Sequence, residues 1–212
     1  MRKHILVAYG TKSGSTAEVA EAIGQAMVSA EVAVDVRSAH EVLSTAGYDA
    51  VVLGGPRVST IWHPDTIDFL DRLGPELAGK PVAYFITSMT LTQSAEERVG
   101  TIPIFQDPAH ARPPRIAGKL GFMEKQSTPA AYLEPVLQKA PDIVPMQVAF
   151  LAGKLDYAKL DFVTRTLFKV VLRMQPGDLR NWEFIHSWAR GLAEVLAGEA
   201  VSLDEARPAA AA

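Results

Sequence analysis

Apolar residues in the first half of the chain switch repeatedly between unbroken runs and helical spacing. The unbroken runs are typical of strands that are buried on both faces of a sheet. The segments between them place apolar residues three or four positions apart, which predicts amphipathic helices. We therefore expect strands over residues 5–9, 32–36, 50–55 and 82–87, with helices after residue 15, over 38–46 and from residue 64.

The second half of the chain continues this alternation after a long interruption at residues 93–127. A fifth apolar run at 144–152 predicts a strand, with a helix over about 129–139 before it and helical stretches near 158–174 and 181–197 after it. Strands that alternate with helices predict an α/β fold. We expect a doubly wound five-stranded parallel sheet with helices on both faces.

Composition favours one soluble globular domain over residues 1–198 and a disordered tail over 199–212. The apolar fraction is 48%, and no run is long enough to span a bilayer. The absence of cysteine excludes disulfide and thiol chemistry, and a net charge of −3 gives no basic field for nucleic acid. The first strand begins too early to follow a secretory signal, so we expect a cytoplasmic protein.

The loop after the first strand, residues 10–16, is rich in glycine and hydroxyl side chains. Its backbone N–H groups and the dipole of the following helix would form a cradle for phosphate. The order of residues excludes a nucleotide triphosphatase loop because Lys12 precedes Gly14. It also excludes a dinucleotide fingerprint, since no third glycine occurs until Gly24. Hydroxyls and amides suit one terminal monophosphate, although an ordinary turn before a helix remains the alternative.

This loop resembles the FMN phosphate loop of the flavodoxin family, in which a similar hydroxyl-Gly-hydroxyl run follows the first strand. The resemblance implies a flavodoxin-like fold with FMN as its cofactor. It also implies that the phosphate group is held by Thr11, Lys12, Ser13, Gly14, Ser15 and Thr16.

Loops that follow parallel strands meet at one edge of the sheet, so other segments should complete this site. The resemblance implies that Trp62 lies beside the flavin ring, although this residue could instead cover the start of the next helix. Arg57 could meet the flavin or an anionic substrate, or be solvated. Backbone groups of Ser88, Met89, Thr90 and Leu91 should meet the pyrimidine edge of the flavin.

The insertion at about 93–127 contains four prolines and five basic residues. Because it leaves the ligand edge of the sheet, we expect a lid or a substrate wall, with a mobile surface segment as the alternative. The sequence offers no partner for His110 within it.

The last third of the chain resembles the flavodoxin-like menaquinone-dependent protoporphyrinogen oxidases. The resemblance rests on residues 150–157, an amphipathic insertion at 161–174, and Asn181-Trp182-Glu183 before the final helix. The insertion at 93–127 is longer than that family's connection, and the segment between Met174 and Trp182 is shorter. The basic amphipathic segment 161–174 could lie on an anionic membrane, pack on a partner or cover the sheet.

The resemblance implies an FMN-dependent oxidoreductase that passes hydride or electrons between an organic substrate, such as a porphyrinogen, and a quinone-like acceptor. Such chemistry resides in the cofactor and requires no catalytic side chain. One alternative is a flavodoxin-type electron-transfer protein, although a net charge of −3 is less acidic than such a carrier favours. The other alternative is an interaction module of the same fold without flavin.

Overall fold

The computed structural model describes residues 2–58, 61–159, 166 and 176–198. The amphipathic segment expected at 161–174 and the tail expected at 199–212 therefore lie outside the described residues, apart from residue 166.

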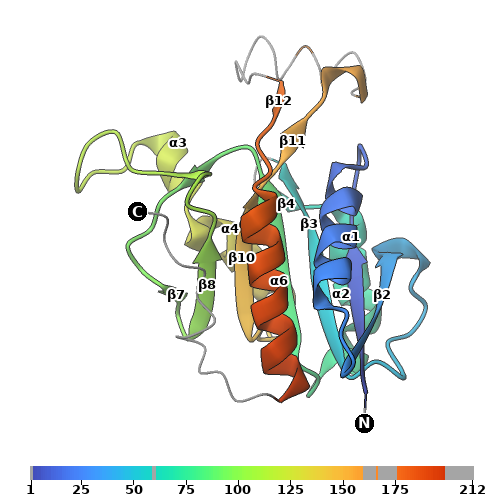
Figure 1. Ribbon diagram of the computed structural model, residues 1–212. Helices are drawn as coiled ribbons and strands as arrows, with labels where there is room; N and C mark the ends of the chain where they lie inside the picture. Colours follow the sequence, from blue (N-terminus) through green and yellow to red (C-terminus); the bar gives the residue numbers. More distant parts are fainter. Residues whose placement is uncertain (1, 59–60, 160–165, 167–175, 199–212) are drawn as a thin grey trace.

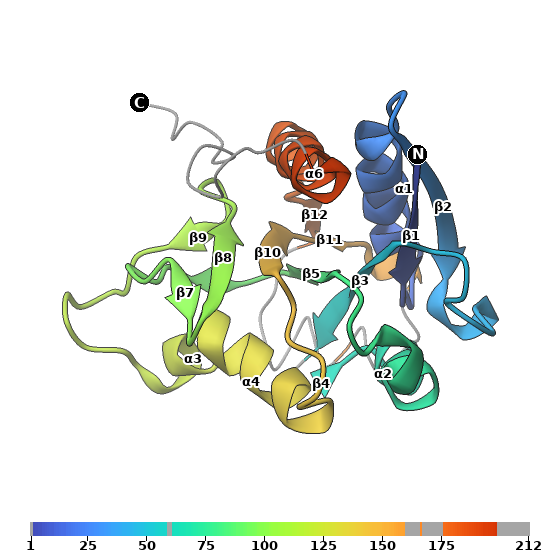
Figure 2. The ribbon, with the colours of Figure 1, turned by 90° about the horizontal axis from the view of Figure 1, so that it is seen from below.

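The fold is a three-layer α/β/α sandwich around a mostly parallel sheet (Figures 1 and 2). Its central strands have the order β2-β1-β3-β5-β10, and every adjacent pair among them is parallel. Their bounds are β1 Lys3–Tyr9, β2 Val32–Ser38, β3 Ala50–Val58, β5 Val82–Ser88 and β10 Gln147–Ala152. The expected doubly wound sheet of five parallel strands is thus confirmed. The fifth strand starts at residue 147 rather than 144, after Pro145, which has no N–H to donate to a ladder.

The sheet is larger than the sequence indicated, because part of the insertion joins it. Strand β8 (Ile102–Gln106) pairs parallel with β10, and β7 (Arg98–Val99) pairs antiparallel with β8. Ile102, Ile104 and Phe105 are buried, and this burial favours a place in the sheet over a place in a lid. Two short pairs lie near the insertion and the end of β3: β4 (Ile61–Trp62) pairs with β3, and β6 (Leu91–Thr92) pairs with β9 (Ala111–Arg112).

Helices cover both faces of the sheet (Figure 2). Helices α1 (Ser15–Met27) and α6 (Trp182–Ala197) pack over one apolar cluster, and α2 (Pro64–Leu77) and α4 (Pro129–Lys139) pack over the other. The helix expected over 38–46 is reduced to a 3-10 turn, η1 (Ala39–Glu41). The remaining elements are the short helix α3 (Phe122–Lys125), a second turn η2 (Tyr157–Lys159), and the antiparallel pair β11 (Lys154–Leu155) and β12 (Gly177–Asp178).

The pair β11 and β12 projects from the carboxyl edge of the sheet, where α1 also begins (Figure 1). This edge gathers the loops that follow β1, β3, β5 and β10. Ligands bind at this edge in open α/β sheets, so a binding site is expected there.

Gly54 of β3 fits against a buried ring with no room for a side chain. A Cβ atom built at Gly54 would lie 2.2 Å from Cε1 of Phe85, which is fully buried. We predict that Gly54→Ala lowers the free energy of unfolding by about 1–3 kcal/mol, because the added methyl overpacks the core. Urea denaturation measures this change. Gly177→Ala is the control because a Cβ there meets nothing within 4 Å. Equal stability of the two variants would contradict the prediction.

Candidate functional site

The loop between β1 and α1 is shaped by backbone contacts and one hydroxyl. The N–H of Gly10 donates to the carbonyl of Gly54 at 2.9 Å, which fixes the loop to β3. The N–H of Gly14 donates to Oγ1 of Thr11 at 3.0 Å. Gly14 adopts a left-handed conformation with φ of 87° and precedes a helix that has no side-chain cap. The first turn of α1 therefore keeps N–H groups that no side chain of the loop satisfies.

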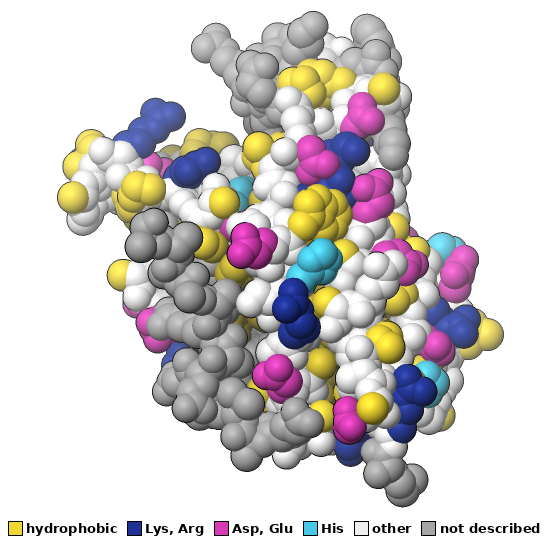
Figure 3. Space-filling model, viewed as in Figure 1, with side chains coloured by type: hydrophobic (Ala, Val, Ile, Leu, Met, Phe, Trp, Pro, Cys, Tyr) yellow, Lys and Arg dark blue, Asp and Glu magenta, His cyan; other side chains and the backbone are white. Residues whose placement is uncertain are grey.

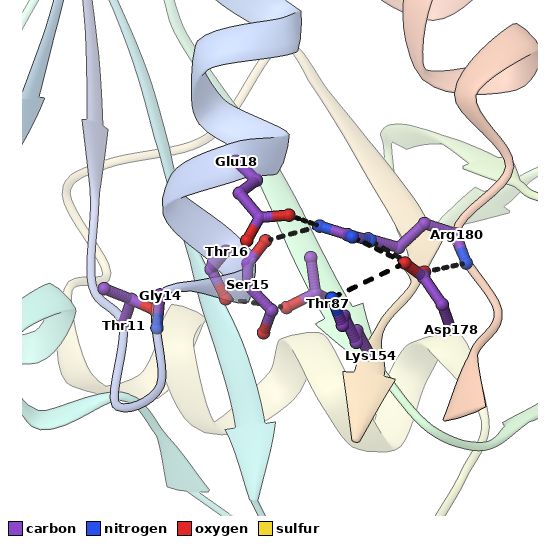
Figure 4. A network of polar contacts seen from close by, with 9 residues as sticks. All are labelled: Thr11, Gly14, Ser15, Thr16, Glu18, Thr87, Lys154, Asp178 and Arg180. Atoms are coloured by element: carbon purple, nitrogen blue, oxygen red, sulfur yellow. Dashed lines mark hydrogen bonds and ion pairs between the residues drawn. The ribbon is translucent and has the colours of Figure 1, made fainter. Parts of the chain in front are cut away.

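The expected phosphate-binding residues divide by exposure. Thr11, Ser13 and Ser15 are partly exposed, and Lys12 is exposed. Thr16 is only 2% exposed, and its Oγ1 lies 3.3 Å from Oγ1 of Thr87 on β5 (Figure 4). The hydroxyl of Thr16 thus links α1 to the sheet beneath the loop and does not face solvent.

An arginine from the far end of the sequence fixes the β11–β12 pair to the start of α1 (Figure 4). Arg180, whose side chain is 4% exposed, donates to Oε2 of Glu18 at 2.7 Å and to the carbonyl of Ser15 at 3.3 Å. Its Nε and Nη2 also donate to the carboxylate of Asp178 at 2.8 and 2.6 Å. These bonds from Arg180 lower the pKa of Asp178. Lys154 lies 4.0 Å from the same carboxylate.

Two cations and two anions of this cluster balance, so the cluster brings no net charge to the loop. The charge of a bound phosphate would have to be matched by the N–H groups of α1, the helix dipole and Lys12. Sequence reasoning missed Arg180 because its partner Glu18 is 162 residues away and no local pattern links them.

Trp62 does not offer its ring to a ligand, contrary to the expectation. The indole is 4% exposed, its Nε1 donates to the carbonyl of Gly55 at 3.1 Å, and its ring meets Tyr84 edge-on at 5.1 Å. Pairing of β4 with β3 turns the side chain into the core under α2. The structure agrees instead with the alternative that this tryptophan covers the start of the helix.

The neighbouring His63 caps α2, because its Nδ1 accepts a hydrogen bond from the N–H of Asp65 at 3.3 Å. Burial lowers the pKa of His63, and nearby Lys12 lowers it further, whereas Asp65 raises it. The loop after β1 packs closely against the start of α2, since a Cβ at Gly10 would lie 2.7 Å from Nδ1 of His63.

Arg57 is partly exposed, and its guanidinium is bound by other parts of the chain. Its Nη1 donates to the carbonyl of Gln126 at 2.7 Å and its Nη2 to the carbonyl of Ala131 at 3.3 Å. The guanidinium carbon lies 3.9 Å from the centre of the Tyr132 ring. Burial lowers the pKa of Arg57. This side chain fastens the end of the insertion and the start of α4 to β3, a role that the sequence did not indicate.

The loop after β5 borders a pocket of about 430 Å³. Met89, Thr90 and Leu91 line it, together with residues 109–127 of the insertion. Ser88 lies behind this lining and is 5% exposed. Its hydroxyl donates to the carbonyl of Thr90 at 3.0 Å. The insertion therefore forms one wall of a pocket, while its earlier part extends the sheet.

His110 has a partner that the sequence did not reveal. Its Nε2 lies 3.0 Å from Oγ of Ser88, and its side chain borders the pocket. Burial and nearby Arg112 lower the pKa of His110 to about 4, so the ring is neutral at neutral pH. Asp107, 1% exposed, accepts hydrogen bonds from Asn181 Nδ2 and from the N–H of Ala109. Burial raises the pKa of Asp107.

Among the described residues, no three His, Asp or Glu side chains are grouped to hold a metal ion. The helices in the described part of the chain include none that is long and apolar enough to cross a membrane.

The buried His110 predicts a pH dependence of stability. Its pKa is about 4 in the folded state and about 6.5 when unfolded, so only the unfolded chain gains a proton between these values. We predict that this residue lowers the free energy of unfolding by up to about 1.4 kcal/mol per pH unit as the pH falls from about 6.5 toward 4. Its contribution is constant above pH 6.5.

Urea denaturation of the wild type and His110→Gln across this pH range tests the prediction. The variant should lose this part of the slope. Asp107, whose raised pKa acts in the opposite direction, is present in both proteins and cancels in the difference. An identical slope in both proteins would contradict the assignment.

Comparison with solved structures finds similar α/β proteins at low identity. A flavodoxin from the domain Archaea is 16% identical with a TM-score of 0.47, covering 91% of this chain and 98% of that one. Oxidised Flavodoxin 2 from Bacillus cereus is 19% identical with a TM-score of 0.46, covering 92% and 99%. Rubredoxin oxygen:oxidoreductase from Desulfovibrio gigas is 11% identical with a TM-score of 0.46, covering 95% and 38%. No curated protein matches the chain.

The match to a family model establishes the family of this chain, because the match spans most of the sequence. The model of the flavodoxin domain matches residues 6–180, from the first strand through the arginine that fixes the β11–β12 pair to α1. With its parallel sheet in the order β2-β1-β3-β5-β10 and helices on both faces, the chain belongs to the flavodoxin domain family.

Proposed function

We propose that this protein binds FMN, with the phosphate group at the start of α1. The observation that carries the proposal is the uncapped helix that begins after left-handed Gly14. A helix N-terminus with unsatisfied N–H groups is an anion site, and Gly14 lets the chain turn sharply in front of it. Membership of the flavodoxin domain family supports the same ligand.

The residues around the loop fit a monophosphate. Ser13 and Ser15 are partly exposed hydroxyls beside the helix start, and Thr11 uses its oxygen to hold Gly14 in place. The glycine at position 10 is required by packing, because a Cβ there would lie 2.6 Å from Oγ1 of Thr66 and 2.7 Å from Nδ1 of His63. Thr16 supports the loop from below through Thr87.

Bound FMN would supply the redox chemistry, and this chain would orient the cofactor and limit access of water to it. Strand β5, which pairs with β3, ends at Ser88. We assign the backbone groups of residues 88–91 to the polar edge of the flavin ring. Ser88 shapes this loop by its bond to the carbonyl of Thr90. Buried Trp62 is not part of the assignment.

We further propose an oxidoreductase that exchanges electrons with an organic molecule, because a pocket borders residues 89–91. In its specific form, this proposal has a porphyrinogen as the electron donor and a quinone-like molecule as the electron acceptor. An electron-transfer protein of the flavodoxin type is the second candidate, favoured by the family itself. A cytoplasmic location with peripheral membrane contact through 161–174 also remains a proposal.

The placement of the phosphate group predicts a selective loss of affinity. The double substitution Ser13→Ala and Ser15→Ala should weaken FMN binding by about 10- to 100-fold, because hydrogen bonds to a charged group are strong. Binding of riboflavin, which has no phosphate, should change little. Titration followed by flavin absorbance and fluorescence measures both affinities.

Ser29→Ala is the control, since Ser29 lies in the loop after α1, at the opposite edge of the sheet. Unchanged FMN affinity in the double variant would refute the phosphate placement. A colourless wild-type protein that takes up no added FMN would refute flavin binding and leave an interaction module as the function.

A further inference from the structure

The pocket beside residues 89–91 combines apolar walls with cationic side chains. It is lined by the loop after β5, by residues 109–115, by α3 and by the segment after β12. Its apolar lining comes from Met89, Leu91, Ala109, Pro113, Met123 and Leu179. Figure 3 shows hydrophobic and basic side chains together over α3 and the loop before it, at the upper left. The volume of about 430 Å³ lies within the usual range for small-molecule sites.

The single carboxylate of the lining is already satisfied by backbone groups. Oε1 of Glu124 accepts from the N–H of Arg115 at 2.8 Å, and Oε2 accepts from the N–H of Gly121 at 2.7 Å. These bonds lower the pKa of Glu124 and keep it ionised. Neither oxygen is bonded to an arginine side chain of the pocket.

Two guanidinium groups are left for a ligand. Arg112 and Arg115 both line the pocket and are exposed, and neither side chain makes a hydrogen bond or ion pair with any residue that the structure describes. The remaining titratable side chain of the lining, His110, is buried, neutral and bonded to Ser88. The lining therefore carries one net positive charge, two arginines against one carboxylate, among apolar side chains.

We propose that this pocket binds an apolar organic anion, with Arg112 and Arg115 as the counter-ions of its carboxylate or similar acid group. Arginine suits this role because its planar fork can make two hydrogen bonds to a carboxylate. The apolar walls would bury a ligand body of two or three rings. The inference rests on the proposed function, in which this molecule is the organic redox substrate next to residues 89–91.

An uncharged ligand would not account for the two arginines in the lining of the pocket. A neutral ring system would use the apolar walls and could stack on a guanidinium, but it would leave the two positive charges without a counter-ion. The charge of the ligand is therefore the property to test, and two probes of equal shape can isolate it.

The experiment compares naphthalene-2-carboxylate with naphthalene-2-carboxamide, which have similar size and differ in charge. Isothermal titration calorimetry on the full chain, with and without FMN, gives both affinities. We expect the carboxylate to bind at least about tenfold more tightly. Raising the salt concentration should weaken only the carboxylate, because salt screens exposed charges.

The variant Arg112→Gln/Arg115→Gln should reduce carboxylate affinity to that of the carboxamide. Arg112→Lys/Arg115→Lys should retain part of the difference, since lysine keeps the charge but not the fork. Arg190→Gln is the matched control, an exposed arginine of α6 on another part of the surface. Thermal denaturation checks that each variant is folded.

Equal affinity of the two probes for the wild type would overturn the proposal, whatever the variants do. Carboxylate binding that survives in the glutamine variant would also overturn it. The FMN titration is read separately from these results. Loss of flavin binding alone would refute the redox function, whereas loss of carboxylate preference alone would refute the anion site.

Discussion

Parallel pairing of β1, β3 and β5 is the constraint on which both candidate sites depend. Parallel strands all end at the same edge, so the loops that follow them must share that edge. Close approach there requires glycine: Gly10 and Gly55 lie where a Cβ would meet the start of α2. The start of α1 and the pocket beside β5 thus lie at the same edge of the sheet because the strands before them are parallel.

Local sequence patterns predicted those elements whose formation depends on residues near them in the chain. The apolar runs located the central strands, and the hydroxyl and glycine pattern located the loop before α1. Trp62 could not be placed this way, because its burial depends on the pairing of β4 with β3 across a turn. Arg57 could not be placed either, because its partners in residues 126–132 are far away in the sequence. The same holds for Arg180, whose contacts with Glu18 bridge the two ends of the domain.

The insertion shows how one segment can serve two purposes. Its residues 98–106 bury apolar side chains at the edge of the sheet, so β10 is covered by β8 instead of ending the sheet. Its later residues turn back over the carboxyl edge and contact the loop after β5 through the β6–β9 pair. The apolar piece at 102–105 was visible in the sequence, but its pairing partner was not, since strand pairing over such a distance leaves no local trace.

Arg57 restricts the conformational freedom of one wall of the pocket. By binding the carbonyl groups of Gln126 and Ala131 and stacking on Tyr132, it ties the far end of the pocket wall to a central strand. A wall held in this way has already lost much of its conformational freedom when the chain folds. Ligand binding then requires less ordering, so more of the contact energy appears as affinity. Folding itself has preorganised this site.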